Sequence, residues 1–95
     1  MALFGSRHNQ VGDEGAKTIA EHLTKLTKLK ELELRCNRIN DSGGKALASA
    51  VSFSRRSNSG FKKLWLHGNV IHKDETKESI KTSLNFLHEG EGLLL

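Results

Sequence analysis

Hydrophobic residues recur along this chain in a spaced pattern that appears three times. Residues 29–39 read L-K-E-L-E-L-R-C-N-R-I and residues 61–71 read F-K-K-L-W-L-H-G-N-V-I, so both fit the template apolar-x-x-L-x-L-x-x-N-x-apolar. Residues 1–11 follow the same template, including Asn9, but carry Ser6 in place of its last leucine. Self-similarity at a period of about 30 residues is typical of proteins built from stacked repeats.

Each template predicts a short strand. Its two leucines lie two residues apart and therefore face the same side of a strand, where we expect them to be buried. The asparagine that follows is expected to turn its side-chain amide into the stack and to bond loop backbone. Besides Asn9, the structural template positions are Leu29, Leu32, Leu34, Asn37, Ile39, Leu64, Leu66, Asn69 and Ile71.

A helix is predicted after each strand, because apolar residues there recur at intervals of three, four and seven. The predicted buried positions are Ala16, Ile19, Ala20 and Leu23, then Leu47, Ala48 and Val51, then Ile80, Leu84 and Leu87. Asp13, and Asp41 or Ser42, are candidate N-caps, since a side-chain oxygen can accept from the free amides of a first helical turn. The third helix is expected to run through His88.

One strand and one helix cannot bury their apolar faces alone, so the units must stack. The sequence therefore predicts an α/β fold, a short solenoid of about three strand–helix repeats. Parallel strands would line the concave face and helices the convex face. We expect one domain over residues 1–95, with repeats at about 1–28, 29–60 and 61–90 and a tail at 91–95.

The unit L-x-x-L-x-L-x-x-N-x-I-x-D-x-G, followed by a helix of the G-A-x-x-I-A-x-x-L type, resembles the ribonuclease-inhibitor-like leucine-rich repeat family. The resemblance covers about residues 1–88. The family includes ribonuclease inhibitor, the sensor arrays of NOD-like receptors, Ran GTPase-activating protein and tropomodulin. Because these proteins do different things, the resemblance implies a horseshoe fold with a binding surface and no particular chemistry.

Composition narrows the class of protein. The chain has 95 residues, of which fourteen are leucine and only 5% are aromatic. Aromatic residues can be this scarce because stacked repeats bury leucines between neighbouring units and need no central core. No apolar run approaches the roughly 18 residues needed to span a bilayer, and no signal-like segment follows Met1. The single cysteine, Cys36, forms no internal disulfide and suits a reducing compartment. We therefore expect a cytoplasmic protein without membrane contact.

The strand residues between the leucines are predicted to face away from the helices and to form columns across the sheet. These columns are Leu3–Glu31–Lys63, Gly5–Glu33–Trp65 and Arg7–Arg35–His67. Trp65 is the candidate anchor for a protein partner, because tryptophan and arginine are enriched at interface hot spots. Its partner-binding neighbours are Glu31, Glu33, Arg35, Lys63 and His67. The alternative is that Trp65 packs locally on the stems of Glu33 and Lys63 or sits in a contact between copies. Separately, Glu31 and Lys63 are expected to form an exposed cross-strand pair.

No other chemistry is indicated. The five histidines lack metal-ligand spacing, no catalytic motif is present, and we expect no enzyme activity, metal or cofactor. The net charge of +4 gathers near the helix-to-strand connections without the interleaved aromatics that nucleic-acid binding favours. The prediction is a non-catalytic module that binds a protein partner on its concave sheet face.

Two alternatives remain open at this point. One is a regulator of a small GTPase resembling the Ran GTPase-activating family. The other is a structural piece of a longer array, of the NOD-like-receptor or tropomodulin type. Exposed edges of the sheet also predict that copies could associate edge to edge, because an unpaired strand edge is a template for another chain.

Overall fold

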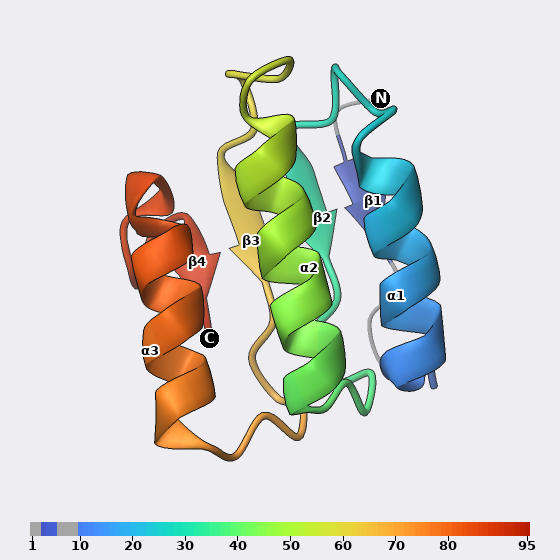
Figure 1. Ribbon diagram of the computed structural model, residues 1–95, viewed down its shortest axis with the longest axis vertical. Helices are drawn as coiled ribbons and strands as arrows, with labels where there is room; N and C mark the ends of the chain where they lie inside the picture. The colour runs from blue at the N-terminus through green and yellow to red at the C-terminus, as the bar shows by residue number, and fades with distance from the viewer. Residues whose placement is uncertain (1–2, 6–9) are drawn as a thin grey trace.

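The computed structural model describes residues 3–5 and 10–95, with side chains described from residue 10 onward. Strands and helices alternate along the chain (Figure 1). Their bounds are β1 (Leu3–Gly5), α1 (Gly12–Leu23), β2 (Glu31–Glu33), α2 (Asp41–Ser54), β3 (Lys63–Trp65), α3 (Asp74–Ser83), the short 3₁₀ helix η1 (Asn85–Leu87) and β4 (Leu93–Leu94). The α/β repeat fold predicted from the sequence is confirmed.

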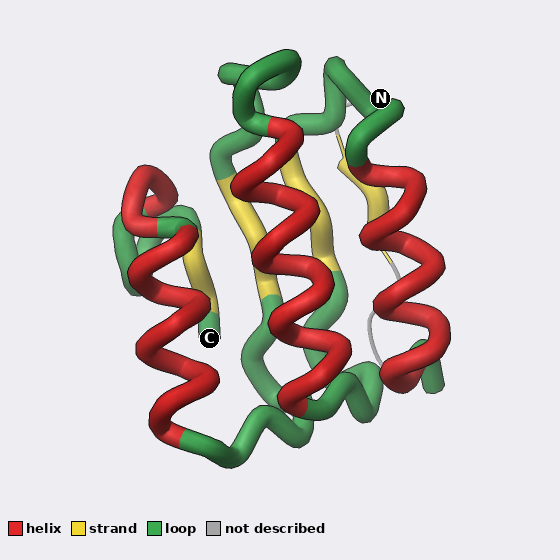
Figure 2. Tube along the Cα trace, in the orientation of Figure 1, coloured by secondary structure: helices red, strands yellow, loops and turns green. Residues whose placement is uncertain are grey.

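The strands form one parallel sheet in the order β1-β2-β3-β4, and the three α-helices lie side by side over one face of it (Figures 1 and 2). In the register, Leu3 pairs with Glu31, and Glu31 pairs with Lys63. Gly5 likewise pairs with Glu33, and Glu33 pairs with Trp65. Equivalent residues of successive repeats therefore stand side by side, as the template predicts.

The core lies between the sheet and the helices. The leucines of the second and third templates, Leu29, Leu32, Leu34, Leu64 and Leu66, are all buried there. The other template residues, Asn37, Ile39 and Ile71, are buried as well, and Asn69 is half-buried. Asn9 lies outside the described residues. Burial of leucine side chains against a helix layer contributes about 1.5–3 kcal/mol each, which is how units this small gain stability from stacking.

Neighbouring repeats are joined by aspartates that sit one repeat apart. The Oδ1 atom of Asp13 accepts hydrogen bonds from the amides of Asn40 (2.9 Å) and Gly43 (3.1 Å) in the next repeat. Asp41 does the same one repeat later, accepting from the amides of residues 72–73 at 3.0 and 3.2 Å. The prediction that these aspartates cap their own helices was wrong, because Val11 and Asn40 hold the N-cap positions and Asp13 and Asp41 lie within the first helical turns.

The cap of α2 is Asn40, whose side chain accepts from the amides of Ser42 (2.9 Å) and Gly43 (3.5 Å). The N-cap position of α1 is Val11, which makes no side-chain capping bond. Residues with a side-chain oxygen at this position satisfy otherwise free amides of the first turn. Asparagine at position 40 therefore performs the role that the sequence suggested for Asp41 or Ser42.

The chain after α3 departs from the template. α3 ends at Ser83 and is followed by η1, so the prediction of a helix through His88 was wrong. His88 has a positive φ of 58°, so the chain leaves helical geometry directly after η1. Leu93 and Leu94, expected in a tail, form β4 beside β3. The cause is a close approach at Gly92, whose carbonyl accepts from Leu64 N at 2.7 Å and brings Leu93 into the core.

The outer edge of β4 is itself occupied. The Leu93 carbonyl accepts from Gly90 N at 2.9 Å, and the Leu93 amide donates to His88 O at 3.3 Å. These bonds use the groups with which another strand would pair. At the opposite side of the sheet, β1 has a strand neighbour only in β2. The two edges of the sheet are therefore different.

Candidate functional site

The sheet face that the helices do not cover carries the residues predicted to bind a partner. Register places Glu31 beside Lys63 and Glu33 beside Trp65, while Arg35 and His67 follow the ends of β2 and β3. We call these six residues the sheet-face patch: Glu31, Glu33, Arg35, Lys63, Trp65 and His67. Glu33 is buried and the other five are half-buried. Arg7, predicted to complete the third column, lies outside the described residues.

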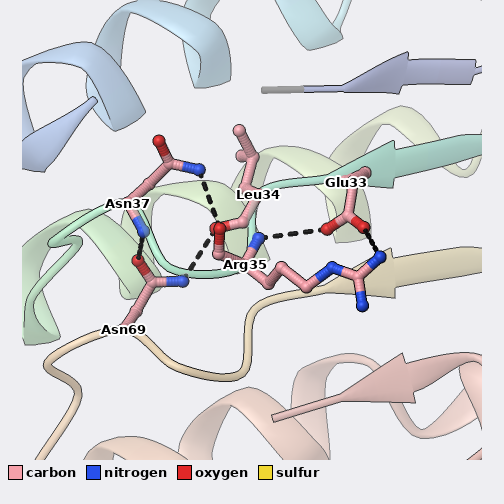
Figure 3. A network of polar contacts seen from close by, with 5 residues as sticks. All are labelled: Glu33, Leu34, Arg35, Asn37 and Asn69. Carbon is pink, nitrogen blue, oxygen red and sulfur yellow. Dashed lines mark hydrogen bonds and ion pairs between the residues drawn. The ribbon is translucent and has the colours of Figure 1, made fainter. Parts of the chain in front are cut away.

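Glu33 and Arg35 form an ion pair at the centre of the sheet-face patch (Figure 3). Arg35 Nη2 lies 2.6 Å from Glu33 Oε1, and the Arg35 amide donates to Glu33 Oε2 at 3.1 Å. Only 7% of Glu33 is exposed, because Arg35 covers this carboxylate. A buried carboxylate needs a partner of opposite charge and hydrogen bonds, and Arg35, two residues past the end of β2, supplies both.

The loop that carries Arg35 is held by two asparagines (Figure 3). Asn37 Nδ2 donates to the Arg35 carbonyl at 3.1 Å. Asn69 Nδ2 donates to the carbonyls of Leu34 and Leu66, both at 2.8 Å. Asn69 Oδ1 also accepts from the amides of Asn37 (2.8 Å) and of residue 39 (3.0 Å). The asparagine of one repeat thus fixes the backbone of the preceding repeat, which orients Arg35.

Trp65 lies between Glu33 on β2 and Leu94 on β4. The Lys63 ammonium stands 4.5 Å from the centroid of the Trp65 ring, a cation–π contact. The expected pair between Glu31 and Lys63 is absent from the ion pairs of the described residues, so that prediction was wrong. Residues two apart on a strand face the same side, so Lys63 can reach the ring along its own strand. The Lys63 charge and the Trp65 ring are therefore held against each other on β3.

His67 extends the sheet-face patch to the end of the sheet. Its Nδ1 atom is buried and has no hydrogen-bond partner among the described residues. The ring lines a cavity of about 480 Å³, whose other walls are Lys77, Lys81, Glu89, Gly90 and Leu93–Leu95. Lys81 pairs with Glu89 at 3.3 Å and with Glu78 at 3.6 Å, and Glu89 in particular raises the pKa of Lys81. The cavity is therefore lined both by apolar leucine side chains and by charged lysine and glutamate side chains.

The aspartate contacts between repeats perturb one further group. The Thr76 hydroxyl and the amides of His72 and Lys73 lower the pKa of Asp41 from 3.8 to about 2. Of these three donors, only the two amides make hydrogen bonds to Asp41 within 3.5 Å, and these bonds stabilise its charged form. Within the described residues, no group of three His, Cys, Asp or Glu side chains could hold a metal ion. Asp41 therefore serves to join repeats.

The structure adds a residue that sequence reasoning missed. Leu94 stands beside Trp65 in the sheet, and no position of the repeat template corresponds to it. The only available signal was the run Leu93–Leu95 after two glycines, which is too short to predict a strand. The sheet-face patch is therefore bordered on its β4 side by apolar surface.

A parallel sheet covered on one face by helices from the same repeats defines an α/β repeat protein. The leucine-rich repeat family model matches residues 7–20 and 25–48, together 38 of the 95 residues. This match supports a leucine-rich repeat protein. The comparison with curated proteins finds no match.

Leucine-rich repeat domains generally mediate protein–protein interaction and are generally non-catalytic. No helix in the described part of the chain combines the length and apolarity needed to cross a bilayer.

Proposed function

We propose that this protein is a non-catalytic interaction module that binds a protein partner on the helix-free face of its sheet. In this proposal, residues 1–95 form one short solenoid of the ribonuclease-inhibitor-like type, and the helix-free face is its concave side. The sheet-face patch is the contact surface. The match to leucine-rich repeats supports the class of function, and the geometry of the patch supports the location.

The observation that carries the proposal is the ordered environment of Trp65. Lys63 covers one part of the ring, and the Glu33–Arg35 ion pair fixes the neighbouring column. Side chains that are already ordered lose less conformational entropy on binding, at about 0.5–1.5 kcal/mol for each flexible side chain that is immobilised. Trp65 would supply apolar contact area, and Arg35 and Lys63 would set the charge of the partner surface.

The test compares Trp65→Ala with Phe53→Ala. Phe53 is 64% exposed on α2, away from the sheet, so its substitution removes a comparable ring outside the patch. Partners captured by cross-linking from the native source are quantified for both variants and the parent protein. We expect the principal partner to be retained by Phe53→Ala and reduced about tenfold or more by Trp65→Ala, the size of a hot-spot truncation. Equal capture by all three proteins would refute the patch.

Fluorescence provides an independent readout. Trp65 is the only tryptophan, and the chain contains no tyrosine, so emission excited at the indole band comes from the sheet-face patch alone. Adding the purified partner should shift the emission to shorter wavelength because the ring loses water. A partner that binds with no change in the position or intensity of the emission would place the interface elsewhere.

A second candidate is self-association through β1, favoured by the difference between the two sheet edges. β4 already uses its outer groups on residues 88–90, whereas β1 is paired on one side only. A dimer formed there would extend the sheet across two copies. Size-exclusion chromatography with light scattering over a range of concentrations tests this candidate. A monomeric mass at the highest concentration would eliminate it.

A further inference from the structure

The end of the molecule where α1 and α2 finish is strongly basic. The loops after these helices span residues 24–30 and 55–62, and neither contains an aspartate or a glutamate. Six side chains in these loops are lysine or arginine, and all six are exposed. We call them the basic ledge: Lys25, Lys28, Lys30, Arg55, Arg56 and Lys62. None of them belongs to the sheet-face patch.

The two loops are fixed beside each other by Asn58. This side chain is 6% exposed, and its Nδ2 donates to the carbonyls of Leu29 (2.6 Å) and Leu26 (3.3 Å) in the first loop. Its Oδ1 accepts from Gly60 N at 3.2 Å. The Lys62 amide also donates to the carbonyl of residue 30 at 2.8 Å. Because the backbones are bonded to each other, the two loops and the cations they carry lie beside each other.

The positive charge of the basic ledge is not neutralised within the protein. None of its six side chains forms an ion pair within 4.0 Å with any described residue, although Glu31 and Glu91 line a hollow together with Lys62. The helix dipole favours a cation in the last helical turn. However, the last turn of α2 has no basic residue and that of α1 has only His22, while Arg55 is the C-cap residue of α2 and Lys25 follows the C-cap of α1. The dipole acts only near the helix end, so it can account for Lys25, Arg55 and the adjacent Arg56. It does not account for Lys28, Lys30 and Lys62, which lie farther along the loops.

Part of the basic ledge surrounds a hollow. The guanidinium of Arg55 lies 4.2 Å from the centroid of the Phe86 ring, which fixes its position over η1. Arg55 and Arg56, together with Ser52, Ser83 and Phe86, line a cavity of about 380 Å³ between the ends of α2 and α3. A guanidinium stacked on a ring keeps its N–H edge free for a planar anion. Two arginines and two hydroxyls around one hollow suit carboxylates.

We propose that the basic ledge docks an acidic segment of a partner polypeptide, whose carboxylates enter the hollow beside Arg55. A single-stranded nucleic acid would need stacking platforms for successive bases. Near the basic ledge only Phe53 is an exposed ring, since Phe86 is half-buried and carries Arg55 on it. A lipid surface presents its anionic headgroups in one plane, whereas a flexible acidic segment can follow both loops and also enter the hollow. The docking surface shares no residue with the sheet-face patch and does not depend on it, although Lys62 lines the same hollow as Glu31 and Lys63.

The probe is a short fluorescein-labelled peptide of glutamate and glycine, followed by fluorescence anisotropy at low and at physiological salt. Arg55→Glu/Arg56→Glu tests the hollow, and Lys25→Glu/Lys28→Glu tests the outer part of the basic ledge. The control is Lys17→Glu/Lys45→Glu, on exposed faces of α1 and α2. Each double variant lowers the formal net charge from +4 to zero, so only the location of the charge differs. Circular dichroism confirms that every variant is folded.

We expect the dissociation constant to rise about tenfold or more in both ledge variants and less than about twofold in the control, because close charge pairs act locally while distant ones are screened. Trp65→Ala should leave peptide binding unchanged, which separates this proposal from the sheet-face patch. Equal losses in the control and ledge variants would overturn it. So would tighter binding of a single-stranded oligonucleotide, or of phosphatidylserine-containing vesicles, than of the peptide.

Discussion

Replacing Asn69 with alanine tests whether one side chain holds two repeats in register. Asn69 makes four hydrogen bonds between 2.8 and 3.0 Å, all with backbone groups of residues 34, 37, 39 and 66. Three of these groups belong to the preceding repeat, so the bonds exist only in the stacked state. Alanine removes all four bonds and leaves two amides and two carbonyls without that partner.

The magnitude follows from the number of bonds. A protein hydrogen bond contributes about 0.5–1.5 kcal/mol net, so four of them correspond to about 2–6 kcal/mol. Asn69 is half-buried, and water reaching the site can replace part of this loss. We expect Asn69→Ala to lower the free energy of unfolding by about 2–4 kcal/mol, near the lower part of that range. Such a loss is a large fraction of the roughly 5–15 kcal/mol typical of a domain.

Urea denaturation followed by circular dichroism and by Trp65 fluorescence measures the change. Asn85→Ala is the matched control, because Asn85 is exposed in η1 and its side chain makes no hydrogen bond with a described residue. We expect the control to remain within about 0.5 kcal/mol of the parent protein. Hydrogen exchange should also accelerate at the amides of Asn37 and Ile39. A loss at Asn69 no larger than that at Asn85 would refute the reasoning.

Three further outcomes are expected. The pKa of Asp41 is lowered to about 2, so its contribution to stability is present above pH 4 and is lost as the pH falls toward 2. In Asp41→Asn, the midpoint of urea denaturation should therefore fall less between pH 5 and pH 2 than it does in the parent protein. The same pH dependence in both proteins would contradict this. Gly68 has φ +76°, and a Cβ there would stand 2.6 Å from Cys36 Sγ. Calorimetry should show Gly68→Ala destabilised by about 1–3 kcal/mol. Gly60→Ala, whose Cβ would have Asn58 Oδ1 as its nearest neighbour at an ordinary 3.6 Å, should stay near the parent protein. Gly92→Ala would place a Cβ 2.6 Å from the Lys62 carbonyl oxygen and even closer to the Leu87 carbonyl oxygen. Hydrogen exchange should then show that the amides of β4 lose protection while those of β2 keep it.

The repeat pattern determined much of the fold before any coordinates. Leucines two apart, followed by asparagine and then by a helical period, predict both elements of each unit. The near-constant spacing of the units predicts which strand residues become neighbours. Glu31 beside Lys63 and Glu33 beside Trp65 follow from that spacing alone, because stacked copies of one unit must align equivalent positions.

Contacts between side chains were harder to predict, since they depend on which neighbour is nearest in space. Glu33 was predicted to face away from the helices, and the sequence did not indicate that Arg35 would cover and neutralise it. Lys63 was expected to meet Glu31, yet its ammonium lies over the Trp65 ring. In each case a residue two positions away in the sequence supplies the contact. Strand geometry permits both contacts, and only the tertiary arrangement selects one.

The sequence by itself determined the repeats, the buried template positions and the sheet register, because these depend on a period that local residues specify. Only the tertiary structure decided that Asp13 and Asp41 bond the following repeat and that Leu93 and Leu94 extend the sheet. It also decided that Asn58 joins the two basic loops into one surface. The physical reason is that these bonds connect groups about 30 residues apart, and their partners become neighbours only after the repeats have stacked.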